Sequence, residues 1–227
     1  MSKCLLFVAI WSFSGSLCAQ TLHYWGEAKS PDGKTVYKES HDIFKKDGQL
    51  LKTVTTYYEP DGKTKLAELT SAYSANVKLP TYEFVDYRQN YREGLRKEGA
   101  NYVVFKQDGK ASEKSKVLAK TDELFAGQGW HFYLADNLQV LEKDDFKLEM
   151  LLPSELDSFE FVMKKSEKKG GKIFTTLQLS NWFLSMFAPK LKLVYDSDSK
   201  RLVEYRGVSN ILDEKGERQE VEIRYRY

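Results

Sequence analysis

The densest grouping of polar and aromatic side chains lies in residues 86–94, which read DYRQNYREG. Asp86 and Arg88 are two positions apart, so a strand through them places both side chains on one face. The planar fork of arginine binds carboxylates and phosphates, which makes Asp86, Arg88 and Glu93 (the polar cluster) a candidate ligand site. A structural ion pair at a strand end uses the same residue types, and we favour that interpretation of Asp86 and Arg88.

Histidine is the second residue type that could do chemistry, and the chain has three, His23, His41 and His131. No two of them have the spacing of metal ligands. Glu39 and His41 share a strand face, but two ligands are too few for a metal site. The sequence also lacks a Gly-x-Ser-x-Gly elbow and a glycine-rich phosphate loop. We therefore predict no metal, no cofactor and no catalytic residue.

The first of two apolar segments is an expected helix that starts at Thr121, which can cap it. Gly127 and Gly129 weaken the first half of this helix, so the segment could form two helical pieces. Beyond the glycines, apolar side chains recur at helical spacing on one stripe. The stripe consists of Trp130, Leu134, Leu138 and Leu141.

The second apolar segment, residues 180–189, reads SNWFLSMFAP and is the most apolar internal stretch. Ser180 or Asn181 can cap a short helix that Pro189 ends. Bulky side chains on every side of such a helix indicate that it is buried or meets lipid. We favour a buried plug, with a ligand site as the alternative. In the ligand hypothesis, the two segments contribute Trp130, Leu134, Leu138, Trp182, Phe183, Met186 and Phe187.

A β-rich scaffold must position these residues. Aromatic residues make up 14% of the chain, and Tyr and Phe favour pleated, half-buried strands. Asp-Gly pairs supply the positive φ of tight hairpin turns. They occur at Asp32-Gly33, Asp47-Gly48, Asp61-Gly62 and Asp108-Gly109. We predict strands over 22–29, 35–44, 50–59, 65–73, 82–88 and 102–106, with a turn-like segment at 90–94.

After residue 145, apolar side chains alternate again, in runs that begin at residues 146, 159, 173, 191, 202 and 220. Apolar faces on one side only predict a sheet that covers one core and is wet on the other side. About eleven strands follow from these runs, and a sheet of that width curls. The predicted fold is mainly β: a large curved antiparallel sheet, as a half-barrel or open barrel, with one or two short helical inserts.

The start of the chain is typical of a secretory signal peptide, since Lys3 precedes an apolar run over 5–10 and small residues lead to Ala19. The run is too short for a bilayer span, which needs roughly 20 apolar residues. We predict a signal peptide over 1–19, a single antiparallel β domain over 20–227, and export to the periplasm. Both cysteines, Cys4 and Cys18, lie in the signal, so the mature chain cannot form a disulfide or a thiolate metal site.

The charge balance argues against one class of partner. The chain carries 35 basic and 33 acidic residues, a net charge of +2. Nucleic-acid-binding proteins usually present a basic face, so we predict no nucleic-acid partner. A local basic run over 164–172 is interrupted by Glu167 and two glycines, which is typical of a solvated hairpin tip.

Several short motifs carry a resemblance. They are Tyr37-x-Glu39-x-His41, Tyr58-x-Pro60-Asp61-Gly62, Pro80-x-Tyr82, Asp86-x-Arg88, Glu93-Gly94 and Arg201-Leu202-x-x-Tyr205-x-Gly207-x-Ser209-Asn210-Ile211. Together they resemble a group of uncharacterised secreted proteins from Gram-negative bacteria, over most of the mature chain. The resemblance implies no activity and assigns no catalytic residue. At the level of fold alone, the chain is similar to the periplasmic lipoprotein-sorting carriers, which are open β-barrels closed by helices.

These observations predict a non-enzymatic periplasmic protein that shelters an apolar or acyl-chain ligand in the concavity of its sheet. A lipid or acylated molecule is the expected partner, and a peripheral membrane contact stays open. One alternative is an integral outer-membrane barrel, because residues 221–227 alternate and end on an aromatic residue. Against it, strands around 38–42 and 53–56 lack a lipid-facing band. The other alternative is an envelope enzyme of unknown reaction that uses His41 or the polar cluster.

Overall fold

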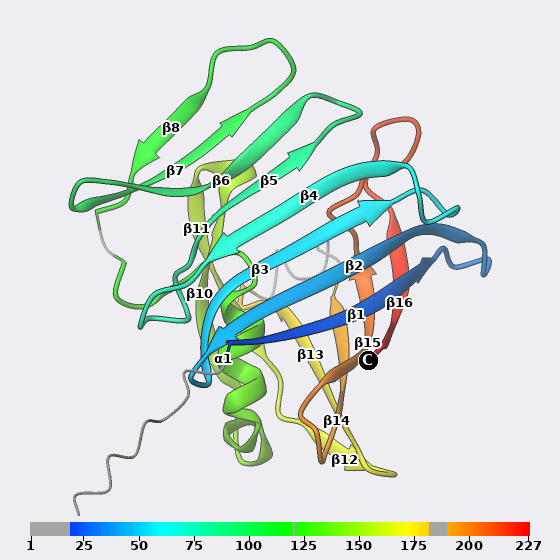
Figure 1. Ribbon diagram of the computed structural model, residues 1–227. Helices are drawn as coiled ribbons and strands as arrows, with labels where there is room; N and C mark the ends of the chain where they lie inside the picture. The colour runs from blue at the N-terminus through cyan, green and yellow to red at the C-terminus, as the bar shows by residue number, and fades with distance from the viewer. Residues whose placement is uncertain (1–18, 120, 182–189) are drawn as a thin grey trace, which may run out of the picture.

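The computed structural model describes residues 19–119, 121–181 and 190–227 (Figure 1). Two predictions fall outside these ranges: the signal peptide apart from Ala19, and the bulky side chains Trp182, Phe183, Met186 and Phe187. Within the described ranges, no helix is both long enough and apolar enough to cross a membrane. Strands make up 56% of the structure and helices 8%, which confirms the mainly β fold.

The first half of the chain is an antiparallel meander. Its strands are β1 (Ala19–Lys29), β2 (Thr35–Lys46), β3 (Gln49–Tyr58), β4 (Lys65–Ala72), β5 (Thr81–Asp86), β6 (Tyr91–Glu98), β7 (Asn101–Gln107) and β8 (Lys114–Val117). Each strand pairs with the next one along the chain, so the whole half needs only short connections.

The second half begins with the helical insert and returns to strands. Its elements are β9 (Leu124–Phe125), α1 (Gly129–Asp136), the 3-10 helix η1 (Leu138–Glu142), β10 (Phe146–Leu152), the 3-10 helix η2 (Pro153–Glu155), β11 (Asp157–Met163), β12 (Glu167–Lys169), β13 (Lys172–Leu179), β14 (Leu191–Asp196), β15 (Leu202–Val208) and β16 (Glu220–Arg226).

In the described part of the chain, all 16 strands belong to one sheet. Its order runs from β8 back to β1, crosses to β16, and continues through β15, β14, β13, β11, β10 and β9, with β12 attached to β13. The pairing of β1 with β16 sets Gly26 opposite Tyr225 and joins the two halves. The sheet stays open, because the outer strands β8 and β9 do not meet. The predicted large curved antiparallel sheet is therefore confirmed.

The hairpin turns follow the predicted Asp-Gly pairs. Gly33, Gly48, Gly62 and Gly109 have φ values of +85°, +79°, +73° and +55°. Between β2 and β3, Asp47 also has a positive φ of +51°, so this two-residue turn has both central residues in the left-handed region. That conformation twists the chain in the sense that strands prefer, which explains the tight connection of two long strands.

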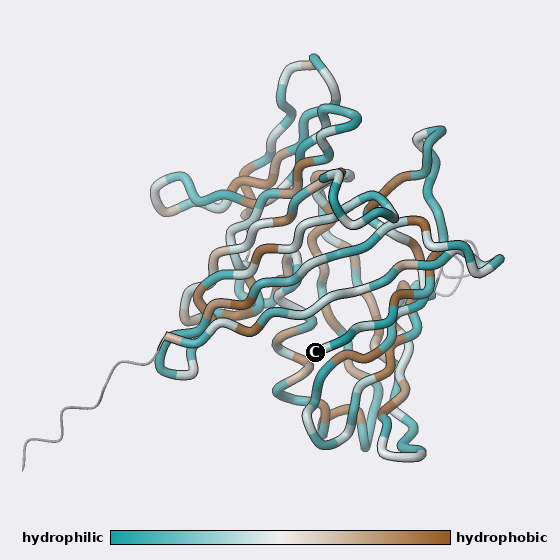
Figure 2. The backbone as a smooth tube through the Cα atoms, turned by 45° about the vertical axis from the view of Figure 1, so that its right-hand side comes forward, coloured by the Kyte–Doolittle hydropathy of each residue, from teal (hydrophilic) through white to brown (hydrophobic). Residues whose placement is uncertain are grey.

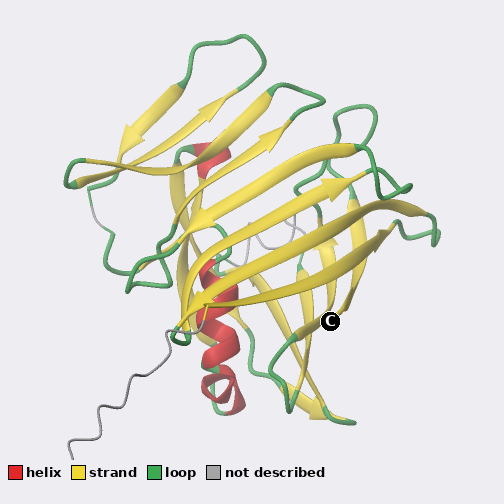
Figure 3. Ribbon diagram, in the orientation of Figure 1, coloured by secondary structure: helices red, strands yellow, loops and turns green. Residues whose placement is uncertain are grey.

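Helix α1 lies on the concave side of the sheet, between its two halves (Figures 1 and 3). Gln128, which directly precedes the helix, reaches the side chains of β3, and His131 contacts Tyr195 of β14. The backbone of Gly129 comes so close to the carbonyl oxygen of Lys78 that a Cβ there would lie 2.3 Å from it. Glycine at this position therefore lets the start of the helix dock against the loop after β4.

The interior divides into two hydrophobic clusters. The first lies under the meander and includes Tyr37, Tyr57, Phe84, Leu95 and Ile223. The second is formed by the strands of the second half with α1 and η1 and includes Leu134, Leu141, Met163, Leu177 and Leu193. Hydrophobic and hydrophilic residues alternate along many strands (Figure 2), as expected of a sheet with one dry face.

Two predicted elements were wrong. Most of the segment predicted as a turn at 90–94 is the start of β6, because Tyr91–Leu95 pair with β5 and Arg92–Glu98 pair with β7. The expected helix does not start at Thr121. Leu124 and Phe125 instead form β9, paired with β10, and the helix starts at Gly129. Two helical pieces, α1 and η1, do occur, but they are divided at Asn137 and not at the glycines.

Candidate functional site

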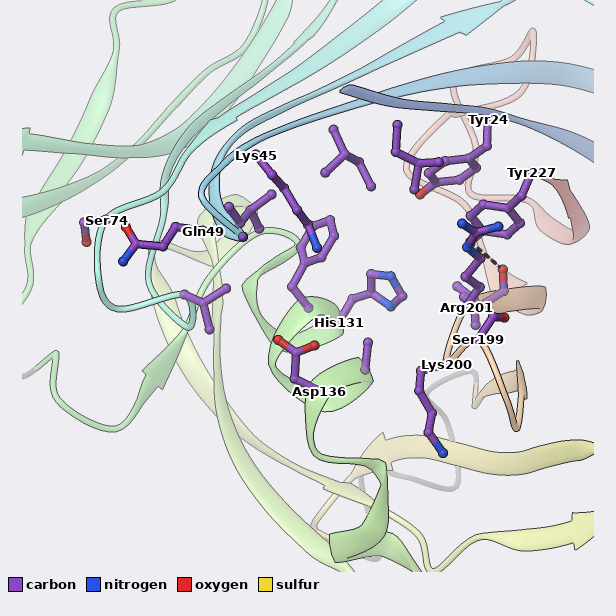
Figure 4. Close-up of a pocket in the computed structure, with 18 of the residues that line it drawn as sticks. Tyr24, Lys45, Gln49, Ser74, His131, Asp136, Ser199, Lys200, Arg201 and Tyr227 are labelled. Atoms are coloured by element: carbon purple, nitrogen blue, oxygen red, sulfur yellow. Dashed lines mark hydrogen bonds between the residues drawn. The ribbon is translucent and has the colours of Figure 1, made fainter. Parts of the chain in front are cut away.

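A cavity of about 550 Å³ lies between α1, the ends of β1 to β3 and the turn before β15 (Figure 4). One part of its wall is aliphatic and is formed by Leu22, Ile43, Leu50, Val77, Ala135 and Leu202. Aromatic rings from three separate segments, Tyr24, Phe132 and Tyr227, complete the wall. The cavity therefore combines apolar surface from both halves of the sheet with surface from the helical insert.

Three cationic side chains also line this cavity, and we call Lys45, Lys200 and Arg201 the cationic rim. Among the described residues of the lining, Asp136 is the only acidic one. None of the three cations forms an ion pair with another described residue, although Arg201 lies over the ring of Tyr227 at 4.7 Å from its centroid. The rim thus carries an excess of positive charge beside an apolar wall.

Helix α1 turns two different faces to its surroundings. His131, Phe132 and Ala135 face the cavity. Leu134 and Leu138, from the predicted ligand stripe, are 1% and 2% exposed and belong to the second hydrophobic cluster. Trp130, on the same stripe, is half-buried against that cluster. The three stripe residues thus pack against the sheet, while the neighbouring helix face borders the cavity.

His131 is a neutral part of the cavity wall. Burial, with a smaller contribution from His41, lowers the pKa of His131 to about 4. Its Nδ1 atom lies 3.3 Å from the hydroxyl oxygen of Tyr195, and the two rings are stacked. His131 therefore adds no positive charge to the cationic rim near neutral pH.

A group of buried polar side chains lies on the concave face of β2, β3 and β4. We call Glu39, His41, Thr53, Thr55, Ser71 and Tyr73 the inner polar site. Strand register places Tyr24, His41 and Thr55 side by side on neighbouring strands. Part of the interior of this half of the sheet thus carries hydrogen-bonding groups beside its hydrophobic cluster, where a β core is usually apolar.

His41 is the centre of the inner polar site. Its Nδ1 atom lies 3.0 Å from the Thr55 hydroxyl, and its Nε2 atom lies 3.1 Å from Oε2 of Glu39. Gly26, opposite Glu39 on β1, makes room for this carboxylate, because a Cβ at position 26 would lie 2.7 Å from the Glu39 Cγ. The glycine at position 26 therefore allows the Glu39 carboxylate to lie beside His41 in the interior of the sheet.

Gln128 ties the inner polar site to helix α1. Its amide nitrogen donates to the Thr55 hydroxyl at 3.2 Å, and its amide oxygen accepts from the Thr53 hydroxyl at 3.0 Å. Since Thr55 accepts from Gln128, its own proton can go to Nδ1 of His41. One amide therefore couples the position of the helix to the hydrogen bonds of β3.

Within the predicted polar cluster, Asp86 and Arg88 pair with each other, whereas Glu93 has a different hydrogen-bond partner. Arg88 donates from Nη2 to Oδ2 of Asp86 at 2.7 Å and from Nε to Oδ1 at 3.2 Å, while its Nη1 donates to the Leu212 carbonyl. Asp86 is 2% exposed, so the pair is structural, as we favoured. Glu93 accepts from the Tyr91 hydroxyl, and no ion pair between Glu93 and Arg88 is found in the described ranges. Burial raises the pKa of Glu93.

Sequence reasoning missed most of the site. It paired Glu39 with His41 on one face but did not find Thr55 or Gln128, which only register and the path of the helix bring together. The cationic rim was also missed, since its residues come from positions far apart in the sequence. Over the described ranges, no cluster of three or more His, Cys, Asp or Glu side chains suited to a metal ion is found.

Comparison with known proteins identifies no relative with which this site can be compared. No protein-family model matches the chain, no curated protein matches it, and no solved structure matches it. The resemblance to secreted proteins and the likeness to lipoprotein-sorting carriers thus stay predictions. The assignment of a function rests on the cavity and its lining.

Proposed function

We propose that the protein is an exported, non-enzymatic carrier that binds an amphiphilic ligand with an acyl chain and an anionic head. The single observation that supports this proposal is the cavity itself, whose aliphatic wall adjoins the cationic rim. Its volume of about 550 Å³ compares with roughly 300–1,000 Å³ for typical small-molecule sites. The acyl chain covers the apolar wall, and the head meets Lys45, Lys200 and Arg201.

The cationic rim and the aliphatic wall together indicate which class of ligand suits the cavity. A purely apolar ligand would leave three cations beside it without a partner, and it would gain nothing from them. A small hydrophilic anion would leave the aliphatic wall in contact with water. An amphiphile with one negative charge satisfies both parts of the lining, because charge-assisted hydrogen bonds to lysine and arginine are stronger than neutral ones.

Export belongs to the proposal. The signal-like pattern that ends at Ala19 directs the chain to the periplasm. A peripheral contact with a membrane surface is the step at which such a ligand enters or leaves the cavity. A nucleic-acid partner is not part of the proposal.

The enzyme alternative has one observation in its favour. Thr55, His41 and Glu39 form a hydroxyl–imidazole–carboxylate series with separations of 3.0 and 3.1 Å, as in nucleophilic catalysis. However, Thr55 is 1% exposed, and Gln128 already donates to its hydroxyl. A substrate would have to displace that amide before it met the hydroxyl, so carrier function fits the described geometry better.

Isothermal titration of the mature protein with tetradecanoate tests the proposal. We expect saturable binding that Ala135→Trp abolishes, because an indole at position 135 would project into the cavity and obstruct it. Val140→Trp is the matched control, since Val140 is 39% exposed and lies outside the cavity lining. Replacing Lys45 and Arg201 with alanine should weaken binding, whereas Lys110→Ala should not. Absence of binding to wild-type protein would reject the carrier function.

A further inference from the structure

The hairpin that joins β2 and β3 forms one lip of the cavity mouth, where the lining residues Lys45, Gly48 and Lys200 are exposed. The same hairpin carries two large apolar side chains that do not belong to the lining. Phe44 is 37% exposed and Leu51 is 44% exposed. The hairpin therefore presents some residues to the cavity and an apolar pair to the solvent beside its mouth.

Strand register brings these two apolar residues together. Phe44 pairs with Lys52, whereas the next residue, Lys45, pairs with Leu50. The register therefore shifts at this step, and Leu51 is the extra residue of a bulge. Leu51 thus lies across the hairpin from Phe44, so the two form one small apolar patch and are not scattered singly over the surface.

Positive charge accompanies the apolar pair on the hairpin. Residues 44–52 read FKKDGQLLK, in which three lysines stand against one acid, Asp47. Lys46 and Lys52 lie outside the cavity lining, and no ion pair of either is found in the described part of the chain. Both lysines are exposed, so their charges are available to an anionic partner.

The opposite lip of the mouth is also cationic. The turn before β15 contributes Lys200 and Arg201, both exposed, against one acid of the same turn, Asp198. Lys45 and Lys200 lie on opposite sides of the cavity (Figure 4). Asp136 of the lining offsets part of this charge, but cations outnumber acids on each lip.

An anionic bilayer surface matches this combination of charge and apolar side chains. Apolar side chains enter the boundary between lipid headgroups and acyl chains, and anionic lipids attract nearby lysines. A protein partner fits less well, because a stable protein interface takes about 20–30 residues from each side. The proposed ligand points the same way, since each methylene group exposed to water makes the transfer of an acyl chain about fourfold less favourable.

We propose that the β2–β3 hairpin docks the protein on an anionic bilayer surface, an inference that rests on the proposed carrier function. The docking surface consists of Phe44, Lys46, Leu51 and Lys52. The two apolar side chains enter the lipid boundary, and the two lysines meet lipid phosphates. The cavity mouth then lies against the bilayer, so the acyl chain of the ligand passes to the aliphatic wall without crossing water.

Co-sedimentation of the mature protein with lipid vesicles tests this inference. The vesicles contain phosphatidylcholine alone or with about one third phosphatidylglycerol, which supplies the negative charge. We expect wild-type protein to bind the anionic vesicles about tenfold more tightly, and added salt to reduce this preference by screening. Phe44→Asp combined with Leu51→Asp should abolish binding. Val117→Asp, at a residue 56% exposed on the outer strand β8, is the matched control and should bind like wild type.

Two further sets of variants decide the matter if the aspartate variants do not fold. Lys46→Glu combined with Lys52→Glu should remove the preference for anionic vesicles, whereas Lys110→Glu should keep it. Leu51→Cys gives the mature chain a single thiol, because the two cysteines of the sequence are at positions 4 and 18. A bimane label on this thiol should shift its emission to the blue on anionic vesicles, and the same label on Val117→Cys should not.

Titration of the same proteins with tetradecanoate separates this inference from the carrier function. The docking variants should keep the wild-type affinity for tetradecanoate, because none of the four residues lines the cavity. If tetradecanoate binds but vesicles do not, or if both kinds of vesicle bind equally, the inference is overturned while the carrier function stands. Unchanged vesicle binding by the docking variants would overturn it as well. If neither tetradecanoate nor vesicles bind, both proposals are overturned.

Discussion

The concave faces of the two halves of the sheet differ in the number of buried polar side chains that they carry. In the second half, aliphatic side chains such as Leu177 and Leu193 are fully buried, and helix α1 packs onto them with Leu134. In the meander, the corresponding face carries Glu39 and His41 together with hydroxyl side chains beside the first hydrophobic cluster. The second half therefore stabilises the fold through close apolar packing. The meander packs less closely where it holds polar side chains beside the cavity.

We expect the largest loss of stability when a buried side chain of the closely packed second half is shortened. Leu177 is 0% exposed in the second cluster, so Leu177→Ala should lower the free energy of unfolding by about 2–5 kcal/mol. Urea unfolding monitored by circular dichroism measures this. Leu51→Ala, at a residue 44% exposed, is the control and should stay within about 0.5 kcal/mol of wild type. A loss below that of the control would mean that the second half is not closely packed.

We expect a smaller loss of stability at Gly26, the glycine that leaves space for the Glu39 side chain. Gly26→Ala places a Cβ 2.7 Å from the Glu39 Cγ and 3.0 Å from atoms of Ile223 and Tyr225. The overpacking should cost about 1–3 kcal/mol in urea unfolding. Adding Glu39→Ala should recover part of this loss, because the two residues are in contact. If the double variant is as unstable as the two single losses added together, the glycine does not serve the carboxylate.

Acid should weaken the contact between the helix and the sheet. The pKa of His131 is about 4 in the folded protein, against about 6.5 in an unfolded chain. Between these values the unfolded state binds more protons, so stability is full above pH 6.5 and falls as the pH drops toward 4. His131→Gln should lose less stability than wild type between pH 7 and pH 5, measured by urea unfolding. Equal losses would show that His131 titrates normally.

We expect the smallest loss of stability when an unpaired hydroxyl of the meander is removed. Ser71 is 0% exposed and its hydroxyl has no hydrogen-bond partner in the described structure, so Ser71→Ala should change stability by less than about 1 kcal/mol. Ser209 is the matched control, since its hydroxyl donates to the Tyr37 oxygen at 3.0 Å and accepts from the Ile211 backbone. Ser209→Ala should cost more than Ser71→Ala in thermal unfolding. The reverse order would show that Ser71 is paired.

The fold could be predicted where the local sequence determines it. The Asp-Gly pairs have the positive φ that their turns need, and alternating apolar residues mark the strands of the second half. Strand β6 escaped prediction because its residues, YREGLRKE, are mostly charged. Arg92 and Arg96 lie on its solvent face and pair with Glu113, so charge in this strand reflects an exposed face rather than a turn.

The site could be predicted only in part. The two-residue spacing of Glu39 and His41 indicates that they share a face, since side chains alternate along a strand. Their partners depend on strand register and on Gln128, 73 residues from Thr55 in sequence, which local patterns do not specify. The helix stripe was visible, but its neighbouring face borders the cavity, and a stripe alone does not tell which face packs and which stays open.

Native mass spectrometry of the protein purified from the cell envelope tests the central claim most directly. We predict that wild-type protein and Val140→Trp carry a co-purified anionic amphiphile, detected as a defined mass increase, and that Ala135→Trp does not. Denaturing extraction should release the same molecule from the first two proteins only. Wild-type protein without any bound molecule, or equal amounts bound to Ala135→Trp, would contradict the account.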